Sequence, residues 1–137
     1  MLGYIIAICT AVIALGITFN YIAHLGTMVK TAEGRGEQGM TVGTVITRFM
    51  FSTMLIELIP IVIIVLSFVL LDSPSEGFPA IPIVIMVGAT VFGAVQILIR
   101  MKQDVPAEAR GQVRSFSMIA MQLVITAPLV GLIFLFI

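Results

Sequence analysis

The chain has 137 residues, of which 60% are hydrophobic and only 10% are charged, and its formal net charge is zero. A mean hydropathy of +1.21 excludes a water-soluble globular domain, because such domains carry far more polar sequence. A membrane span takes roughly 20 apolar residues, so four spans and their connections account for the length. We therefore expect an all-α membrane protein that is not an enzyme and has no catalytic residue, metal site or cofactor.

Four apolar stretches are expected to cross the bilayer, at residues 3–28, 45–71, 79–99 and 115–137. The middle connection, residues 72–78, is rich in Ser, Pro, Gly and acidic residues, a composition typical of a turn. It divides the chain into two tandem helical hairpins, residues 1–72 and 73–137.

Small residues in the first span lie on one face of a helix: Gly3, Ala7, Ala11, Ala14 and Thr18. The third span has Ala89 and Gly93 four residues apart. Small residues let membrane helices approach closely. We expect the first and third helices to form an inner layer, and the small face of the first to be buried between subunits.

The second span contains Glu57, inside an otherwise hydrophobic run from Phe49 to Leu66. A charge at the centre of a membrane helix costs about 3 kcal/mol by insertion scales, and a carboxyl lowers that cost by taking up a proton or finding a cation. Glu57 is therefore the candidate ion-binding residue. The three residues after it offer no side-chain oxygen, whereas sodium needs several oxygen ligands, so a proton is favoured over sodium.

Four other polar residues are candidates to support an ion at Glu57: Thr18, Asn20, Gln122 and Thr126. Asn20 and His24 are one helical turn apart, as are Gln122 and Thr126. The alternative for all of them is hydrogen bonding between helices. Glu57 itself has such an alternative, as a protonated acid that only fixes helix packing.

The basic residues all fall in or beside the first and third connections: Lys30, Arg35, Arg48, Arg100, Lys102, Arg110 and Arg114. The middle connection carries only Asp72 and Glu76. Because basic residues stay cytoplasmic, we expect both long connections inside the cell and both termini outside.

The second and fourth spans match at an offset of 68 residues, which pairs Gly43 with Gly111, Met50 with Met118, Pro60 with Pro128 and Phe68 with Phe136. A shared offset along a whole helix indicates duplication of a hairpin. At this offset Glu57 corresponds to Ile125, so only the first hairpin keeps a carboxyl.

Two runs resemble the proteolipid (c) subunit of rotary F- and V-type ATP synthases. The run from Glu108 to Arg114, Glu-Ala-Arg-Gly-Gln-Val-Arg, resembles that family's entry into its second helix, and Glu57-Leu58-Ile59-Pro60-Ile61 resembles its Glu-Ala-Leu-Pro-Ile run. A double hairpin with one carboxylate is similar to the duplicated proteolipids of V-type enzymes. Those relatives usually keep the carboxylate in the second hairpin, whereas this chain has it in the first.

The resemblance implies a homo-oligomeric ring in which Glu57 binds a proton while facing lipid. It implies release of the proton in a half-channel of a partner membrane protein. It also implies a multi-pass protein of a prokaryotic plasma membrane, in contact with lipid and without a nucleic-acid partner.

Two other functions remain open. Small four-helix proton-coupled exporters also have one membrane glutamate, but they bind cationic aromatic drugs, which calls for aromatic rings near the carboxylate. This chain has no Trp, and both its tyrosines, Tyr4 and Tyr21, lie in the first span. The third function is that of a structural subunit of a membrane complex, without transport.

The topology can be tested with single cysteines in a background without Cys9. A cysteine at Glu33 should react with an impermeant thiol reagent only from the cytoplasmic side, because the basic connections stay there. Reaction only from the outside would contradict the topology and the ring with it.

Overall fold

The computed structural model describes residues 1–34, 39–71, 79–102 and 107–136. They form four helices, α1 (Leu2–Ala32), α2 (Val42–Leu70), α3 (Ala80–Met101) and α4 (Ala107–Phe136), and no strand occurs in these ranges. Each helix is long and apolar enough to cross a membrane. The chain is therefore an all-α, multi-pass membrane protein, as its composition predicted.

Two helices extend beyond the predicted spans by four residues or more. α1 continues to Ala32, and α4 begins at Ala107, well before the apolar stretch that starts at residue 115. The added residues are mostly Ala, Lys, Arg and Glu, which favour helix as strongly as apolar residues do. α1 ends where Gly34 takes a positive φ of 76°, a conformation that glycine adopts at helix ends without steric cost.

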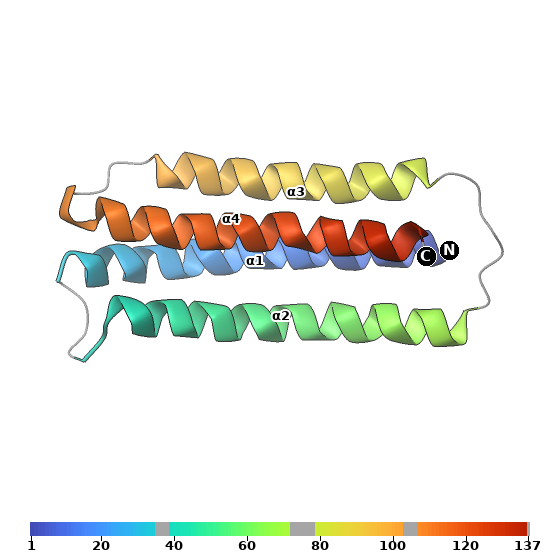
Figure 1. Cartoon of the computed structure of the whole chain (residues 1–137), viewed down its shortest axis with the longest axis horizontal. Coiled ribbons are helices and arrows are strands. Elements are labelled where there is room, and N and C mark those ends of the chain that lie inside the picture. The colour runs from blue at the N-terminus through green and yellow to red at the C-terminus, as the bar shows by residue number, and fades with distance from the viewer. Residues whose placement is uncertain (35–38, 72–78, 103–106, 137) are drawn as a thin grey trace.

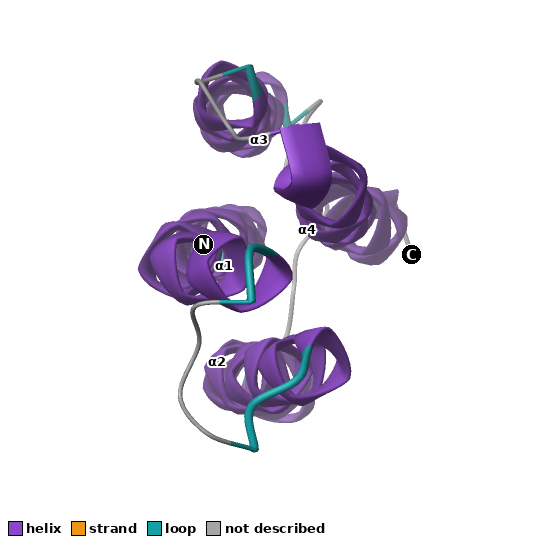
Figure 2. Cartoon of the chain, turned by 90° about the vertical axis from the view of Figure 1, so that its left-hand side faces the viewer, coloured by secondary structure: helices purple, strands orange, loops and turns teal. Residues whose placement is uncertain are grey.

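α1 is the central helix of the bundle. It packs against α2, α3 and α4, and α3 and α4 also pack against each other. Figure 1 shows the four helices running along one common direction, with the start of α1 and the end of α4 at the same end. In the view along the bundle, α2 and α3 lie on opposite sides of α1 (Figure 2).

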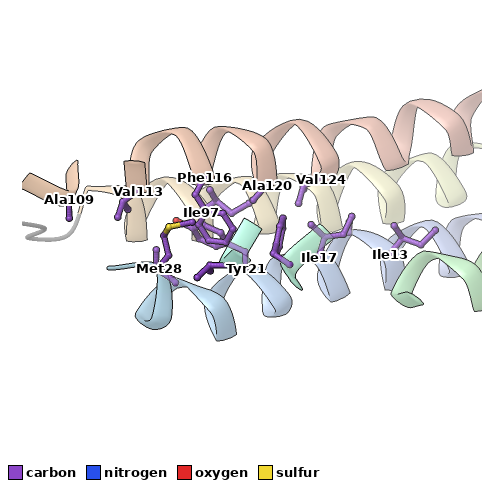
Figure 3. Close-up of a cluster of buried hydrophobic side chains, with 14 residues drawn as sticks. Ile13, Ile17, Tyr21, Met28, Ile97, Ala109, Val113, Phe116, Ala120 and Val124 are labelled. Atoms are coloured by element: carbon purple, nitrogen blue, oxygen red, sulfur yellow. The ribbon is translucent and has the colours of Figure 1, made fainter. Parts of the chain in front are cut away.

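The main core joins α1 to α4. On α1 the buried residues Ile13, Ile17, Tyr21 and Met28 recur at intervals of four or seven, so they share one helix face. They meet a matching strip of α4 residues that includes Val113, Phe116, Ala120 and Val124 (Figure 3).

Aromatic rings connect this core to α2. The Phe116 ring centroid lies 5.3 Å from that of Tyr21 and 4.9 Å from that of Phe49, which α2 contributes. Phe49 is completely buried. The three rings join α1, α2 and α4 at one level of the bundle.

The small-residue face of α1 is buried inside a single chain. Ala7 is 0% and Ala14 1% exposed, and a Cβ at Gly3 would lie 3.4 Å from Leu135 and 3.5 Å from Pro82. The expectation that this face lies between subunits is therefore wrong. The chain uses it to bring α3 and α4 close to α1.

The two ends of the bundle differ in charge. Basic residues cluster where α1 and α3 end and where α2 and α4 begin, and the described ones are Lys30, Arg48, Arg100, Lys102, Arg110 and Arg114. We call this the basic end, and the opposite one, where α1 begins and α4 ends, the terminal end. Arg35, Asp72 and Glu76 lie outside the described residues.

α2 and α4 bury corresponding positions. The pairs Val45 and Val113, Phe49 and Ser117, and Pro60 and Pro128 are all buried, whereas Met50 and Met118 are both exposed. Each pair is separated by the 68 residues of the predicted repeat. Other pairs at this offset differ, because Arg48 is exposed while Phe116 is buried, and Ile63 is exposed while Gly131 is buried. The duplicated hairpin therefore stays a prediction.

Close packing around α1 can be tested at two glycines of α3. A Cβ at Gly93 would lie 2.5 Å from Thr18 Oγ1 and 3.1 Å from a methyl of Val124, whereas a Cβ at Gly88 would meet nothing within 4 Å. Gly93→Ala should lower the free energy of unfolding in detergent by about 1–3 kcal/mol, the usual cost of overpacking. Gly88→Ala should not lower it. Equal effects of the two variants would contradict the close approach of α3 to α1.

Candidate ion-binding site

Glu57 lies midway along α2, half-buried, at the edge of a cavity between α1, α2 and α4. The cavity has a volume of about 210 Å³. Three of its lining residues carry side-chain oxygen: Glu57 on α2, Thr126 on α4 and Thr10 on α1. The remaining lining residues are apolar: Ile13, Ile61, Ile64, Val65, Leu123, Ala127, Val130, Gly131 and Phe134.

The helix around Glu57 explains why its side chain reaches this cavity. Its neighbour Ile56 faces α1, where a Cβ on Gly16 would lie 2.6 Å from Ile56 Cγ2. Pro60, one turn further along α2, is buried. α2 therefore approaches α1 closely beside Glu57, and the carboxyl lies on the side that faces α4.

Within the described part of the chain, the Glu57 carboxyl has no hydrogen bond and no ion pair. Buried polar groups normally find a partner, and hydrocarbon supplies none. The carboxyl is thus left available to bind something that the chain does not contain.

Of the four predicted supporting residues, the structure brings Thr126 to the cavity of Glu57. The Thr126 hydroxyl donates a hydrogen bond of 2.7 Å to the backbone oxygen of Gln122. Gln122 itself is exposed and does not line the cavity.

Thr18 and Asn20 have other contacts and do not line the cavity. The Thr18 hydroxyl donates to the Ala14 backbone oxygen at 2.9 Å. Asn20 Nδ2 donates to the backbone oxygen of Phe49 at 3.1 Å and to Thr53 Oγ1 at 3.0 Å. Asn20 therefore joins α1 to α2, which is the helix–helix alternative stated for it above.

His24 belongs to the same contact between α1 and α2. Its Nδ1 lies 2.9 Å from the Asn20 backbone oxygen. Its ring stands edge-on to the Phe49 ring at a centroid distance of 6.0 Å.

Sequence reasoning missed Thr10 and the pair of Tyr21 and Ser117, whose hydroxyl oxygens lie 2.6 Å apart. Thr10 is 2% exposed and lies between Ala7 and Ala14 at helical intervals of three and four. That spacing was the available signal, since it places Thr10 on the face that packs against the other helices.

Two aromatic pairs lie where α2 meets α4, on either side of the cavity along the bundle. Toward the basic end the Phe49 and Phe116 rings are 4.9 Å apart. Toward the terminal end the Phe68 and Phe134 rings are 5.5 Å apart. The cavity occupies the stretch between these two contacts.

No three His, Cys, Asp or Glu side chains come together as a metal site among the described residues. Comparisons with protein-family models, with curated proteins and with solved structures found no match to this chain.

The hydrogen bond between Asn20 and Thr53 can be measured with a double-mutant cycle. Asn20→Leu, Thr53→Val and the double variant should show a coupling of about 0.6 kcal/mol in the free energy of unfolding, typical of such bonds in membranes. Thr90→Val is the control for Thr53→Val, because Thr90 bonds only within α3, to the Met86 backbone oxygen. Strictly additive effects would mean that the two side chains do not interact.

Proposed function

We propose that this chain is a proteolipid-like subunit of a membrane ring, and that each copy binds and releases one proton at Glu57. The observation that carries the proposal is the Glu57 carboxyl, which lies beside a cavity in the middle of a spanning helix with no partner in the described chain. Uptake of a proton removes the cost of a charge at that depth. Release of the proton requires a place where water or a positive charge stabilises the ionised carboxylate.

The lack of a partner also weakens the structural alternative. A carboxylic acid that fixed helix packing would donate a hydrogen bond to a neighbouring helix. The nearest helices offer Thr10 and Thr126 at the cavity, but neither is hydrogen-bonded to Glu57. A carboxyl at this depth that forms no contact between helices would add the cost of its charge without stabilising the bundle.

The helix arrangement is compatible with a ring of double hairpins. α1 and α3 pack side by side, as an inner layer requires, and Pro60 of α2 and Pro128 of α4, 68 residues apart, are both buried. α2 also presents a broad apolar surface that includes Phe51, Leu55, Leu58, Ile59 and Val62, all exposed. Lipid or a neighbouring copy would cover this surface in the membrane.

The proposal includes a topology and a partner. The basic end would face the cytoplasm by the positive-inside rule, with both termini outside, in the plasma membrane of a prokaryotic cell. A separate membrane protein would supply the half-channels, and a basic residue in it would favour the ionised carboxylate.

The exporter is less well supported. Binding of aromatic cations needs rings around the carboxylate, and Phe134 is the one aromatic residue among the cavity's lining residues. Tyr21 is buried and bonded to Ser117 instead. Tyr4 is exposed and does not line the cavity.

Carbodiimide labelling of the detergent-extracted protein tests the ion site. The protonated carboxyl transfers its proton to a nitrogen of the carbodiimide, and the carboxyl oxygen then adds to the reagent's central carbon. Modification of Glu57 should therefore accelerate as the pH falls, and sodium at constant pH should not slow it. Glu57→Gln should lose the modification but keep its native mass, because the amide is neutral and similar in size. Glu33→Gln serves as the matched control and should keep the modification at Glu57.

Three results would change the proposal. Protection of Glu57 by sodium would replace the proton by sodium. A wild-type carboxyl that resists the reagent at every pH would remove the ion site. A native mass of a monomer or dimer would exclude the ring.

A further inference from the structure

Thr10 is a feature of the cavity that the proposed function does not use. Its hydroxyl lies against Gly131 of α4, where an added Cβ would collide with it. The residue is 2% exposed and lines the cavity, yet its hydroxyl has no hydrogen-bond partner within the described ranges. The Thr10 oxygen keeps some exposed surface, because it is not among the fully enclosed side-chain oxygens and nitrogens that lack a partner in the described residues. A polar molecule inside the cavity can therefore form a hydrogen bond with it.

Two further groups that line the cavity can each form an additional hydrogen bond. The Thr126 hydroxyl donates its proton to Gln122, so its oxygen still has lone pairs that can accept. Glu57 has no partner among the described residues. Three helices thus each contribute one polar group to a single cavity.

The size of the cavity separates the candidate occupants. A water molecule needs roughly 10–15 Å³ of cavity volume. A cavity of about 210 Å³ therefore admits several water molecules. A bare ion would leave most of the space empty, and a lipid chain would offer no hydrogen bond to the Glu57 carboxyl or the Thr10 hydroxyl. Purely apolar cavities of about 150 Å³ stay dry, but this one has a carboxyl and two hydroxyls on its wall.

We propose that water fills this cavity and connects Glu57 with the terminal end of the bundle, so that one access route to the carboxyl lies within the chain itself. The lining residues extend along α2 from Glu57 to Val65, about 12 Å at 1.5 Å per residue. On α4 they reach Phe134, two residues before the helix ends.

The neighbouring contacts give the route its direction. Toward the basic end it is closed by the packed rings of Phe49 and Phe116 and by the hydrogen bond from Asn20 to Thr53. Toward the terminal end the tilted pair of Phe68 and Phe134 lies among packed apolar side chains that include Ile6 and Ile64. An apolar constriction of this kind admits or excludes water according to its width, so we expect these side chains to control entry from the terminal end.

Two adjacent positions on α4 give a matched test. Val130 lines the cavity, whereas its neighbour Leu129, also exposed on the bundle surface, does not. Each is replaced by cysteine in a Cys9→Ala background, in vesicles whose orientation is fixed by an N-terminal tag. A charged, impermeant methanethiosulfonate reacts with the thiolate, which forms only where water reaches. Val130→Cys should be modified from the terminal side, and Leu129→Cys should not.

Two further variants identify the route. Thr10→Val removes the hydroxyl at nearly constant volume and should slow modification of Val130→Cys several-fold. Thr90→Val, whose hydroxyl bonds within α3 away from the cavity, should leave the rate unchanged. Phe68→Ala should accelerate modification, because it removes one ring of the constriction.

Equal modification of Val130→Cys and Leu129→Cys, modification of neither, or modification of Val130→Cys from the basic side would overturn the inference. These outcomes are independent of the proposed function. If Val130→Cys is not modified but carbodiimide labelling of Glu57 depends on pH, the water route is excluded and the ion site remains. If Val130→Cys is modified from the terminal side but Glu57 does not react, the water route remains and the ion site is excluded.

Discussion

The structure depends on how closely α3 and α4 approach α1. Lipid tails are as apolar as the helices, so helices in a membrane associate through close packing and hydrogen bonds rather than by escaping water. Both close contacts pair a threonine of α1 with a glycine, Thr18 with Gly93 on α3 and Thr10 with Gly131 on α4. The absence of a Cβ at each glycine lets the hydroxyl of the threonine occupy that space.

α2 is attached to the bundle in a different way. Apart from the contact of Ile56 with Gly16, its connections include the hydrogen bonds from Asn20 and the two phenylalanine pairs with α4. The phenylalanine rings hold α2 beside α4 at two levels without closing the space between them. The cavity lies between α2 and α4 in the stretch that these two ring contacts leave open.

The sequence predicted the parts of this arrangement that depend on a single helix. Length and hydropathy were enough to predict four spans. The position of Glu57 among apolar residues was enough to make it the candidate ion-binding residue. Contacts between helices were harder, because they depend on the rotation of each helix about its axis. Thr126 was predicted to lie near the depth of Glu57, because depth depends only on position along the helix. Thr126 does line the same cavity. The burial of Ala7 inside the chain and the cavity position of Thr10 depend on rotation, and both were missed.

In the predicted repeat, the position in α4 that corresponds to Glu57 has different surroundings from those of Glu57. Ile125 is exposed and does not line the cavity, so a carboxyl there would point away from the chain's own polar groups. It would need a partner from another molecule, or it would meet the full cost of its charge in lipid. Glu57 instead shares a cavity with hydroxyls from α1 and α4 of its own chain. If the two hairpins arose by duplication, as predicted, a carboxyl at position 125 would have been the one without polar neighbours in its own chain. Glu57 is the one with such neighbours.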